Sequence, residues 1–161
     1  ASLTGHLVLS SLHTNDAATG VTRLLDMGIE PYLLAASLRA VLAQRLVRRL
    51  CETCRTSRQI STEERVLLGP RASDIMSIST PVGCTACHGT GYAGRLLLSE
   101  ILTITPALRQ AIIENAEPSK LRTLAAVSAS SGSLLDSGIF ALRDRRTSLS
   151  EVLNATGADE T

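Results

Sequence analysis

Apolar and polar stretches alternate along the first 28 residues in the order that an α/β unit requires. Residues 3–12 read LTGHLVLSSL, and this short apolar run predicts a strand buried on both faces of a parallel sheet. A polar cluster follows at residues 13–16, in which Thr14 or Asn15 is expected to cap a helix, and Gly28 stands where that helix should end. Strand, polar turn and helix in this order predict the α/β fold class.

Proline and capping residues mark the later helices. Pro31 suits the first turn of a helix that continues to residue 38, and Ser61 with Glu64 forms a capping box ahead of a short helix. Beyond the second pair of cysteines the sequence is interpreted as helical, with a break in the serine-rich residues 128–133. The other residues expected to begin or end helices are Gly69-Pro70, Thr105-Pro106, Pro118, Ser148 with Glu151, and Gly157.

Residues 41–50 fit two kinds of element. Leu42, Leu46 and Leu50 recur every four residues, as they would on a helix. Two valines and a following cysteine suit instead a strand that leads into a cysteine knuckle. Both interpretations stay open.

Composition and charge narrow the class of protein. Of the 161 residues 44% are hydrophobic but only 2% are aromatic, so the core must consist of Leu, Val, Ile and Ala. The formal net charge of +1 gives no global field that would attract nucleic acid or an anionic bilayer. The sequence shows no transmembrane span or secretory signal, which predicts a cytoplasmic protein without direct membrane insertion. Because it lacks an initial Met and opens on an apparent buried strand, we expect a fragment of a longer protein.

The four cysteines fall into two CxxC pairs, Cys51 with Cys54 and Cys84 with Cys87. A two-residue spacer lets both thiolates of a pair face one ion, and two pairs complete a tetrahedral shell without an open position for water. We therefore predict a structural Zn site. Two disulfides are the alternative, but they need an oxidising compartment for which the sequence carries no targeting signal. His88 could replace one ligand, although a solvated side chain beside a complete site is the simpler interpretation.

His6 and His13 bracket the first predicted strand, seven residues apart. A fully extended strand would separate them by about 23 Å, which is too far for both to bind one metal. His13 lies in the polar cluster just past the carboxyl end of the predicted strand, where open α/β sheets bind ligands. It is therefore a candidate functional residue, and a hydrogen-bonded structural histidine is the alternative.

Three segments in a fixed order resemble the type II/IV secretion ATPase superfamily. They are LTGHLVLSSLHTNDAATGVTRLLDMG, then QRLVRRLCETC, then CTACHGTGYAGR ahead of LLLSEIL. The resemblance covers much of residues 3–102, with weaker similarity up to Gly157. The tetracysteine segments are similar to the branch of that superfamily formed by type II secretion motors and type IV pilus extension motors.

The resemblance implies a hexameric RecA-like ATPase that binds ATP and Mg between its subunits and drives assembly of a pseudopilus or pilus. It also implies a position at the bacterial inner membrane, reached through secretion platform proteins. The segment from His6 to Asn15 matches the family's histidine box, in which the residue matching His13 lies near the γ-phosphate. The two cysteine pairs match the family's zinc module.

One family motif is missing from these residues. A phosphate-binding loop of the form GxxxxGK[ST] is absent, because no glycine is followed by lysine and the only lysine is Lys120. The family's acidic boxes would precede Ala1. Since phosphoryl transfer depends on these groups, we expect the chain alone not to hydrolyse ATP.

Arginines crowd residues 39–58. They are Arg39, Arg45, Arg48, Arg49, Arg55 and Arg58. A helix over this stretch would bring Arg45 and Arg49 onto one face, which makes these two candidate nucleotide or interface residues that sense phosphate between subunits. A solvated or subunit-contacting face is the alternative.

Two rival functions use the same cysteines. A zinc-ribbon module for nucleic acid is opposed by the near-neutral charge and by the scarcity of aromatic residues for base stacking. The zinc domain of a J-domain chaperone is similar to CTACHGTG, but the first cysteine pair does not repeat that element.

The residue patterns thus predict an α/β protein with an inserted tetracysteine zinc module and a C-terminal helical bundle, and the resemblance implies that its first part is a partial RecA-like ATPase core. The expected domains are residues 1–50 for the core with the histidine box, residues 51–95 for the zinc module, and residues 96–161 for the C-terminal helical subdomain.

Overall fold

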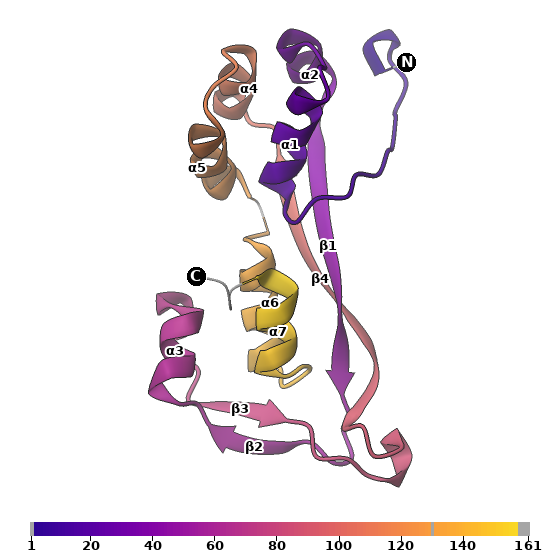
Figure 1. The fold of residues 1–161 in the computed structure, drawn as a ribbon, viewed down its shortest axis with the longest axis vertical. Coiled ribbons are helices and arrows are strands. Elements are labelled where there is room, and N and C mark those ends of the chain that lie inside the picture. The colour runs from indigo at the N-terminus through magenta and orange to yellow at the C-terminus, as the bar shows by residue number, and fades with distance from the viewer. Residues whose placement is uncertain (1, 130, 158–161) are drawn as a thin grey trace. The chain divides into compact units, whose positions relative to one another are not determined.

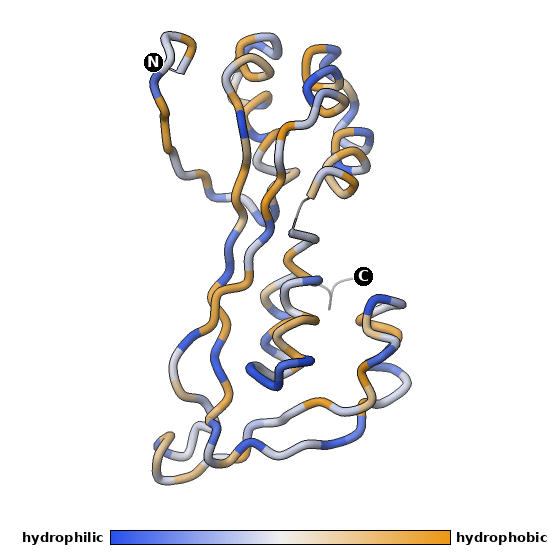
Figure 2. The backbone as a smooth tube through the Cα atoms, turned by 180° about the vertical axis from the view of Figure 1, so that it is seen from behind, coloured by the Kyte–Doolittle hydropathy of each residue, from blue (hydrophilic) through white to orange (hydrophobic). Residues whose placement is uncertain are grey.

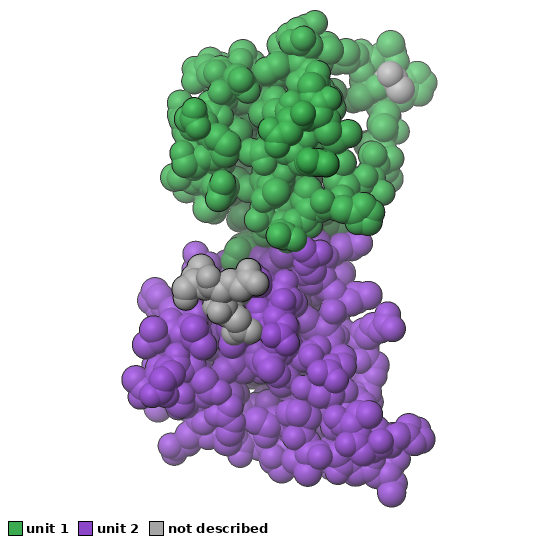
Figure 3. Space-filling view, viewed as in Figure 1, with its two compact units in different colours: residues 1–43, 99–133 green, residues 44–98, 134–161 purple. Residues whose placement is uncertain are grey.

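The computed structural model describes residues 2–129 and 131–157, and over these residues the chain combines helices with two-stranded sheets (Figure 1). The chain forms two compact units, each assembled from two separate stretches of sequence (Figure 3). Unit 1 comprises residues 1–43 and 99–133, and unit 2 comprises residues 44–98 and 134–161. The mixture of helices and strands confirms the expected α/β class.

Unit 1 contains helices packed around a small aliphatic core. They are α1 (Ala17–Asp26), α2 (Pro31–Ser37), α4 (Pro106–Ile113) and α5 (Pro118–Ser128). Helix α1 packs against α2 and α5, and α4 packs against α2 and α5. Val21, Leu34, Leu108, Ile112 and Leu121 are buried between them. Their burial fixes the four helix faces on one another.

The predicted caps of unit 1 are largely confirmed. Thr105 caps α4 through its side chain, which accepts the N–H of Leu108, and Pro31 and Pro118 begin α2 and α5. The N-cap of α1 is Asp16 rather than Thr14 or Asn15, because the Asp16 carboxylate accepts the N–H of Thr19 at 2.6 Å. These caps depend on residues a few positions apart, which is why the sequence locates them within two residues.

The predicted strand over residues 3–12 is wrong. Ser2–Thr4 forms a short 3-10 turn (η1), and residues 6–14 have no regular structure and no strand partner among the described residues (Figures 1 and 2). Leu7 and Leu9 are 85% and 87% exposed. The apolar pattern suits a strand, but a strand forms only where a neighbour accepts and donates its backbone hydrogen bonds.

Residues 41–50, which fit both helix and strand by their pattern, belong to the strand β1 (Ala40–Leu50). It pairs in a two-stranded sheet with β4 (Tyr92–Thr103), a long strand where the sequence pattern predicts helix. Leu96, Leu98 and Leu102 of β4 are buried, whereas Leu97 and Ile101 between them are exposed. Apolar residues on both faces conceal the two-residue period of a strand, which explains the wrong assignment.

Unit 2 packs two helices against a small antiparallel sheet. The sheet pairs β2 (Thr56–Gln59) with β3 (Ser77–Thr80), so that Thr56 faces Thr80 and Gln59 faces Ser77. The helical elements are α3 (Thr62–Leu68), η2 (Pro70–Ala72), η3 (Thr85–Cys87), α6 (Leu134–Arg143) and α7 (Leu149–Thr156). The core gathers Ile60, Leu68, Ile75, Ile78, Ile139, Leu142, Leu149 and Val152.

The predicted helix ends of unit 2 are confirmed. Ser61 and Glu64 form the expected capping box on α3, which ends at Gly69. Ser148 caps α7, and Gly157 ends it with φ of +67°.

Helix α5 ends at residue 128 and α6 begins at residue 134, so the break lies in the predicted serine-rich stretch, of which residue 130 lies outside the described residues. None of the described helices is long and apolar enough to cross a bilayer.

A clamp centred on Arg48 joins β1, β4 and α7 within unit 2. The guanidinium lies 4.1 Å from the centre of the Tyr92 ring and donates to Glu151 Oε1 at 2.8 and 3.0 Å. The backbone N–H of Arg48 donates to Glu151 Oε2 at 2.7 Å. Thr147 Oγ1 donates to the Arg48 carbonyl at 2.8 Å, and the Tyr92 hydroxyl lies 2.9 Å from Ser148 Oγ. These contacts hold the start of α7 against the end of β1.

The clamp changes the ionisation of both charged partners. Desolvation alone would raise the pKa of Glu151, but hydrogen bonds from the side chain and backbone of Arg48 outweigh it, and the pKa is lowered. The hydrogen bond to Glu151 raises the pKa of Arg48. A carboxylate with a lowered pKa stabilises the fold above its unfolded-state pKa, and this contribution is lost as the pH falls through the folded-state pKa.

Replacing Gly138 with Ala is expected to lower the free energy of unfolding by about 1–3 kcal/mol, because a Cβ atom there would overlap with Val152 Cγ1 where α6 meets α7. This loss should exceed the gain of about 1 kcal/mol in helix propensity. Urea denaturation measures it. In a Val152→Ala background the overlapping methyl groups are gone and the same substitution should cost clearly less. An equal cost in both backgrounds would show that this contact is absent.

Glu151→Gln is expected to lower the free energy of unfolding by about 1–2 kcal/mol at pH 7, because it removes the charge from the hydrogen bonds with Arg48. Since Glu151 has a lowered pKa, this difference should persist above pH of about 4.3 and shrink at lower pH as the native carboxylate is protonated. Denaturation of both proteins from pH 7 to pH 3 tests it.

The matched control for that experiment is Glu52→Gln, which weakens the exposed pair of Glu52 with Arg49. An exposed pair of this kind contributes at most about 1 kcal/mol, so the control should cost less than Glu151→Gln. Equal costs, or a Glu151→Gln difference that does not change with pH, would argue against the clamp.

Candidate metal centre

The structure brings the four cysteines of the two CxxC pairs together. Cys51 directly follows β1 and Cys54 lies in the turn after it, whereas Cys84 precedes η3 and Cys87 ends it. All four Sγ atoms lie within 4.8 Å of one another. The Sγ atoms of Cys51 and Cys84 are 3.9 Å apart, those of Cys54 and Cys87 are 3.8 Å apart, and those of Cys84 and Cys87 are also 3.8 Å apart.

These distances fit a metal shell and exclude disulfides. Four thiolates placed tetrahedrally at about 2.3 Å from a zinc ion lie about 3.8 Å from one another. A disulfide would need sulfur atoms about 2.05 Å apart, and all four cysteines are free. The donor set is therefore compatible with zinc, and the disulfide alternative is rejected.

Backbone amides of the second pair's loop point at the sulfur atoms. The N–H of Gly83 donates to Cys54 Sγ at 3.3 Å, and the N–H of Gly91 donates to Cys87 Sγ at 3.1 Å. The N–H of Cys84 donates to Cys87 Sγ at 3.2 Å. Donors of this kind stabilise a thiolate, so the loop is suited to sulfur that carries negative charge.

Glycine is required at two turns of this loop. Gly83 has φ of +108°, and a Cβ there would lie 2.5 Å from the Gly89 carbonyl oxygen. Gly91 has φ of +76°, and a Cβ there would lie 2.5 Å from Pro81 Cβ. Both the left-handed backbone and the close approach exclude a side chain, which explains why glycines crowd the second cysteine pair.

The thiols differ in their readiness to ionise. Desolvation raises the pKa of Cys54 to about 11. Desolvation also acts on Cys87, but the backbone N–H groups of Cys84 and Gly91 outweigh it and lower its pKa to about 6. The N–H of Thr53 lowers the pKa of Cys51. Four thiolates at these distances repel one another, so holding all four deprotonated requires a cation between them.

The predicted nucleotide residues are divided between the two units. His6, His13 and Asn15 belong to the extended segment of unit 1, where His13 and Asn15 are exposed and His6 Nδ1 lies 3.1 Å from Thr4 Oγ1. Arg45 and Arg49 lie on β1 in unit 2, the unit that holds the cysteine cluster. Neither unit by itself therefore contains all five residues.

The helix that would bring Arg45 and Arg49 onto one face does not form, because both residues lie on the strand β1. Residues four positions apart on a strand still point to the same face, but they are separated by about 13 Å. Arg49 pairs with Glu52, immediately after the first cysteine. The nucleotide or interface role of the two arginines stays a prediction.

His88, the possible substitute ligand, is exposed and has φ of +52°. Among the described residues, the group of side chains close enough together to hold a metal ion consists of the four cysteines and does not include His88. The simpler interpretation, an exposed side chain beside a complete shell, therefore fits the geometry.

Sequence reasoning missed the role of Arg48, which fixes the end of β1 just before the first cysteine pair. Its clamp on Glu151 and Tyr92 directly precedes Leu50 and Cys51, whose N–H groups donate to the carbonyls of Arg146 and Gly91. Arg48 is one of six arginines in a crowded run, and Glu151 reads only as part of a helix cap. A pair 103 residues apart leaves no signal in local spacing.

Comparison with known proteins places the chain in a family. Residues 1–154 match the family model described as "Type II/IV secretion system protein". The chain is 44% identical over 158 residues to the putative type II secretion system protein E of Escherichia coli K12, covering 98% of this chain and 32% of that protein. It is 45% identical over 159 residues to type II secretion system protein E of Aeromonas hydrophila, covering 99% of this chain and 31% of that protein.

A pilus protein is similar to nearly the same extent. The type IV pilus assembly ATPase PilB of Myxococcus xanthus is 40% identical over 162 residues, covering 99% of this chain and 28% of that protein. The chain therefore spans about a third of the length of the curated relatives that it matches. The resemblance inferred from the histidine-box and cysteine segments is confirmed, and the chain belongs to the type II/IV secretion system protein family.

Proposed function

We propose that this chain is the C-terminal part of an ATPase that powers type II secretion or type IV pilus assembly. The carrying observation is the match to the family over residues 1–154, together with relatives whose names include secretion protein E and the pilus assembly ATPase PilB. It favours this function over the nucleic-acid and chaperone alternatives, because those rivals explain only the cysteine segments. The choice between a pseudopilus and a pilus depends on the machine that the longer protein serves.

We also propose that Cys51, Cys54, Cys84 and Cys87 hold one structural zinc ion. Their Sγ atoms are spaced as a tetrahedral thiolate shell requires, and backbone amides point at the sulfurs. When bound, zinc would supply a fixed cross-link and no catalytic chemistry, because four thiolates leave no open position. The cysteines would hold the end of β1 beside the start of β4. They would also hold together the chain segments that enter β2 and leave β3.

Purified chain is expected to contain about one zinc per molecule, measured by inductively coupled plasma mass spectrometry. Removing the metal with a chelator should disorder residues 51–91, seen as loss of their dispersed amide signals in NMR spectra, because the cross-link between the two arms is gone. Substitution with Co²⁺ should give the visible absorption of a tetrahedral tetrathiolate. Cys84→Ser should lower the metal affinity and the thermal stability.

His88→Ala is the matched control, because His88 adjoins the cluster but is exposed and outside the four-sulfur shell. The variant should keep the zinc content and the cobalt spectrum of the parent protein. A metal-free chain with four reactive thiols and an unchanged NMR spectrum would overturn the zinc proposal.

For the longer protein we propose a cytoplasmic homo-hexamer that binds ATP and Mg and contacts inner-membrane secretion platform proteins, without inserting into the bilayer or binding nucleic acid. Residues 1–50 would belong to the ATPase core, residues 51–95 to the zinc module and residues 96–161 to a C-terminal helical subdomain. The histidine box supports this role, with His13 near the γ-phosphate and His6, Asn15, Arg45 and Arg49 at the nucleotide or subunit interface. These 161 residues hold no phosphate-binding loop, so the chain alone should not hydrolyse ATP.

In the longer ATPase, His13→Ala is expected to lower kcat for ATP hydrolysis by at least about tenfold while zinc content stays unchanged, because His13 would act at the γ-phosphate and not in the cysteine cluster. Phosphate release measures the rate. Thr85→Ala, an exposed change beside Cys84, is the control and should keep the parent rate. Full activity of the His13 variant, or ATP hydrolysis by the 161-residue chain, would contradict the assignment.

A further inference from the structure

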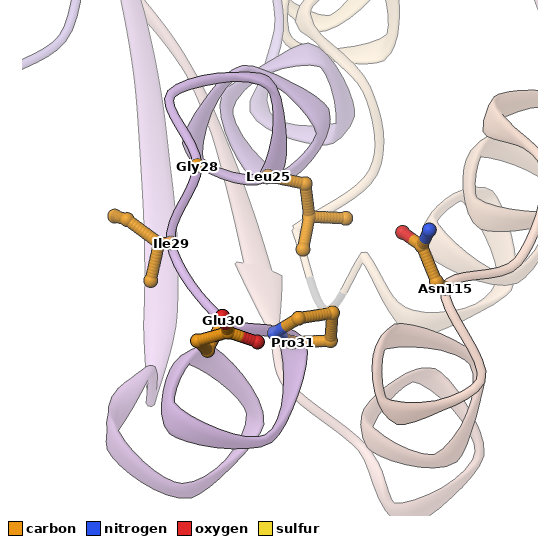
Figure 4. A pocket seen from close by; sticks show the side chains of 6 residues that line it. All are labelled: Leu25, Gly28, Ile29, Glu30, Pro31 and Asn115. Atoms are coloured by element: carbon orange, nitrogen blue, oxygen red, sulfur yellow. The ribbon is translucent and has the colours of Figure 1, made fainter.

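An open notch of about 210 Å³ lies in unit 1 between the connection from α1 to α2 and the connection from α4 to α5. It is lined by Leu25, Gly28, Ile29, Glu30, Pro31 and Asn115. Figure 4 shows the side chains of Leu25 and Pro31 facing the notch and the amide of Asn115 across from them, whereas the side chain of Ile29 points away. The notch thus combines an apolar wall with two polar groups.

Two helix C-termini meet at this notch. Helix α1 ends with Gly28 at φ of +82°, where the N–H of Ile29 donates to the Leu24 carbonyl. Helix α4 ends in the same geometry with Asn115 at φ of +49°, where the N–H of Ala116 donates to the Ala111 carbonyl. Each helix C-terminus carries about half of a negative charge, so both favour a cation in the notch.

Glu30 is the ionisable residue that lines the notch, and its carboxylate adds to this negative potential. Arg23 in the last turn of α1 and Lys120 in the first turn of α5 offset part of it. The connecting segments, residues 26–30 and 114–117, carry Asp26, Glu30, Glu114 and Glu117 but no Lys or Arg. Glu114 pairs with Lys120, whereas Asp26, Glu30 and Glu117 have no basic partner within 4.0 Å among the residues that the structure describes. The positive N-terminal end of α2 opposes this negative potential only weakly, because the Glu30 carbonyl already accepts two of the N–H groups in the first turn of α2.

The side-chain amide of Asn115 is not required to end helix α4. Glycine is the usual residue at this left-handed position, and Asn is the tolerated substitute. The backbone N–H of Asn115 is used by the helix end, and its amide has no hydrogen-bond partner among the described side chains and backbone groups. The amide oxygen is therefore free to accept from a ligand in the notch.

Size and surroundings indicate a side chain of a protein partner rather than a free cofactor. Pockets for small ligands usually measure about 300–1,000 Å³, which exceeds this notch. Large apolar side chains around it are exposed, with Met27 and Tyr32 at 61% and Ile113 at 47%. Met and Tyr are enriched in protein interfaces, where they surround one anchoring residue.

We propose that this notch binds one arginine side chain of a partner protein, with leucine-like apolar residues of the partner beside it. The aliphatic stem would lie on Leu25 and Pro31, and the guanidinium would donate to the carboxylate of Glu30 and the amide oxygen of Asn115. Arginine fits better than lysine, because its planar fork can reach two acceptors at once. The site goes beyond the proposed ATPase function and does not depend on nucleotide or zinc.

The test is an NMR titration of the ¹⁵N-labelled chain with the peptide acetyl-Ala-Leu-Arg-Leu-Ala-amide. We expect amide shifts centred on residues 26–31 and 113–117, with Kd on the order of 1 mM and weaker binding at high salt. The same peptide with citrulline in place of arginine keeps the shape without the charge and should bind at least about tenfold more weakly. Arginine amide alone lacks the flanking leucines and should also bind at least about tenfold more weakly.

Variants separate the notch from general charge attraction. Glu30→Gln and Asn115→Gly should each weaken the peptide by about fivefold or more, and the glycine keeps the left-handed helix end of α4. Asp144→Asn, at an exposed carboxylate of unit 2, should leave the affinity unchanged. Equal binding of the citrulline peptide, shifts spread over other acidic surfaces, or no shift at about 10 mM peptide would overturn the proposal. Equal binding of arginine amide would overturn it too, because it would show a site for small cations instead of a docking site.

Discussion

The geometry of unit 2 depends on the convergence of four sulfur atoms within 4.8 Å. The two pairs are separated in sequence by a segment that contains β2, α3 and β3, so their meeting closes this segment into a loop. Closing the loop costs chain entropy, and four adjacent thiolates would repel one another. The N–H donors of Gly83 and Gly91 offset part of that repulsion, and a cation at the centre would remove the rest. The glycine turns and the Arg48 clamp then fix how the strands leave the cluster.

Local signals in the sequence locate most helix ends correctly. The caps by Ser61, Thr105 and Ser148 and the terminator Gly157 are all recognisable, because each depends on side chains and dihedral angles within one helical turn. Strands are recognised poorly. The run in β4 has leucines on both faces, and residues 6–14 have the composition of a strand without a neighbouring strand among the described residues. A strand is defined by its partner, and pairing over long sequence separations leaves no local pattern.

The candidate metal centre follows the same rule: the features set by local spacing are predictable from the sequence, and those set by long-range contacts are not. The spacing of the cysteines is enough to predict their convergence, because two CxxC pairs match the ligand spacing of a tetrahedral zinc site. The clamp between Arg48 and Glu151 could not be inferred, since it joins positions 103 residues apart. The notch at Glu30 and Asn115 is also invisible in the sequence, although the left-handed Gly28 is expected there as a helix end. The negative potential of the notch arises only because the fold places the C-terminal ends of α1 and α4 beside the same notch.

The two groups of candidate residues therefore differ in how much of their environment the chain itself supplies. The cysteine cluster receives its hydrogen-bond donors, its glycine turns and its anchoring clamp from unit 2. His13 receives none of these within the described residues, because it lies exposed in a segment without strand pairing. A side chain can orient a phosphate only if its own position is fixed by neighbours. The physical basis for a role of His13 must therefore come from groups that order residues 6–14, whereas the cysteine cluster carries the conditions for its role within unit 2.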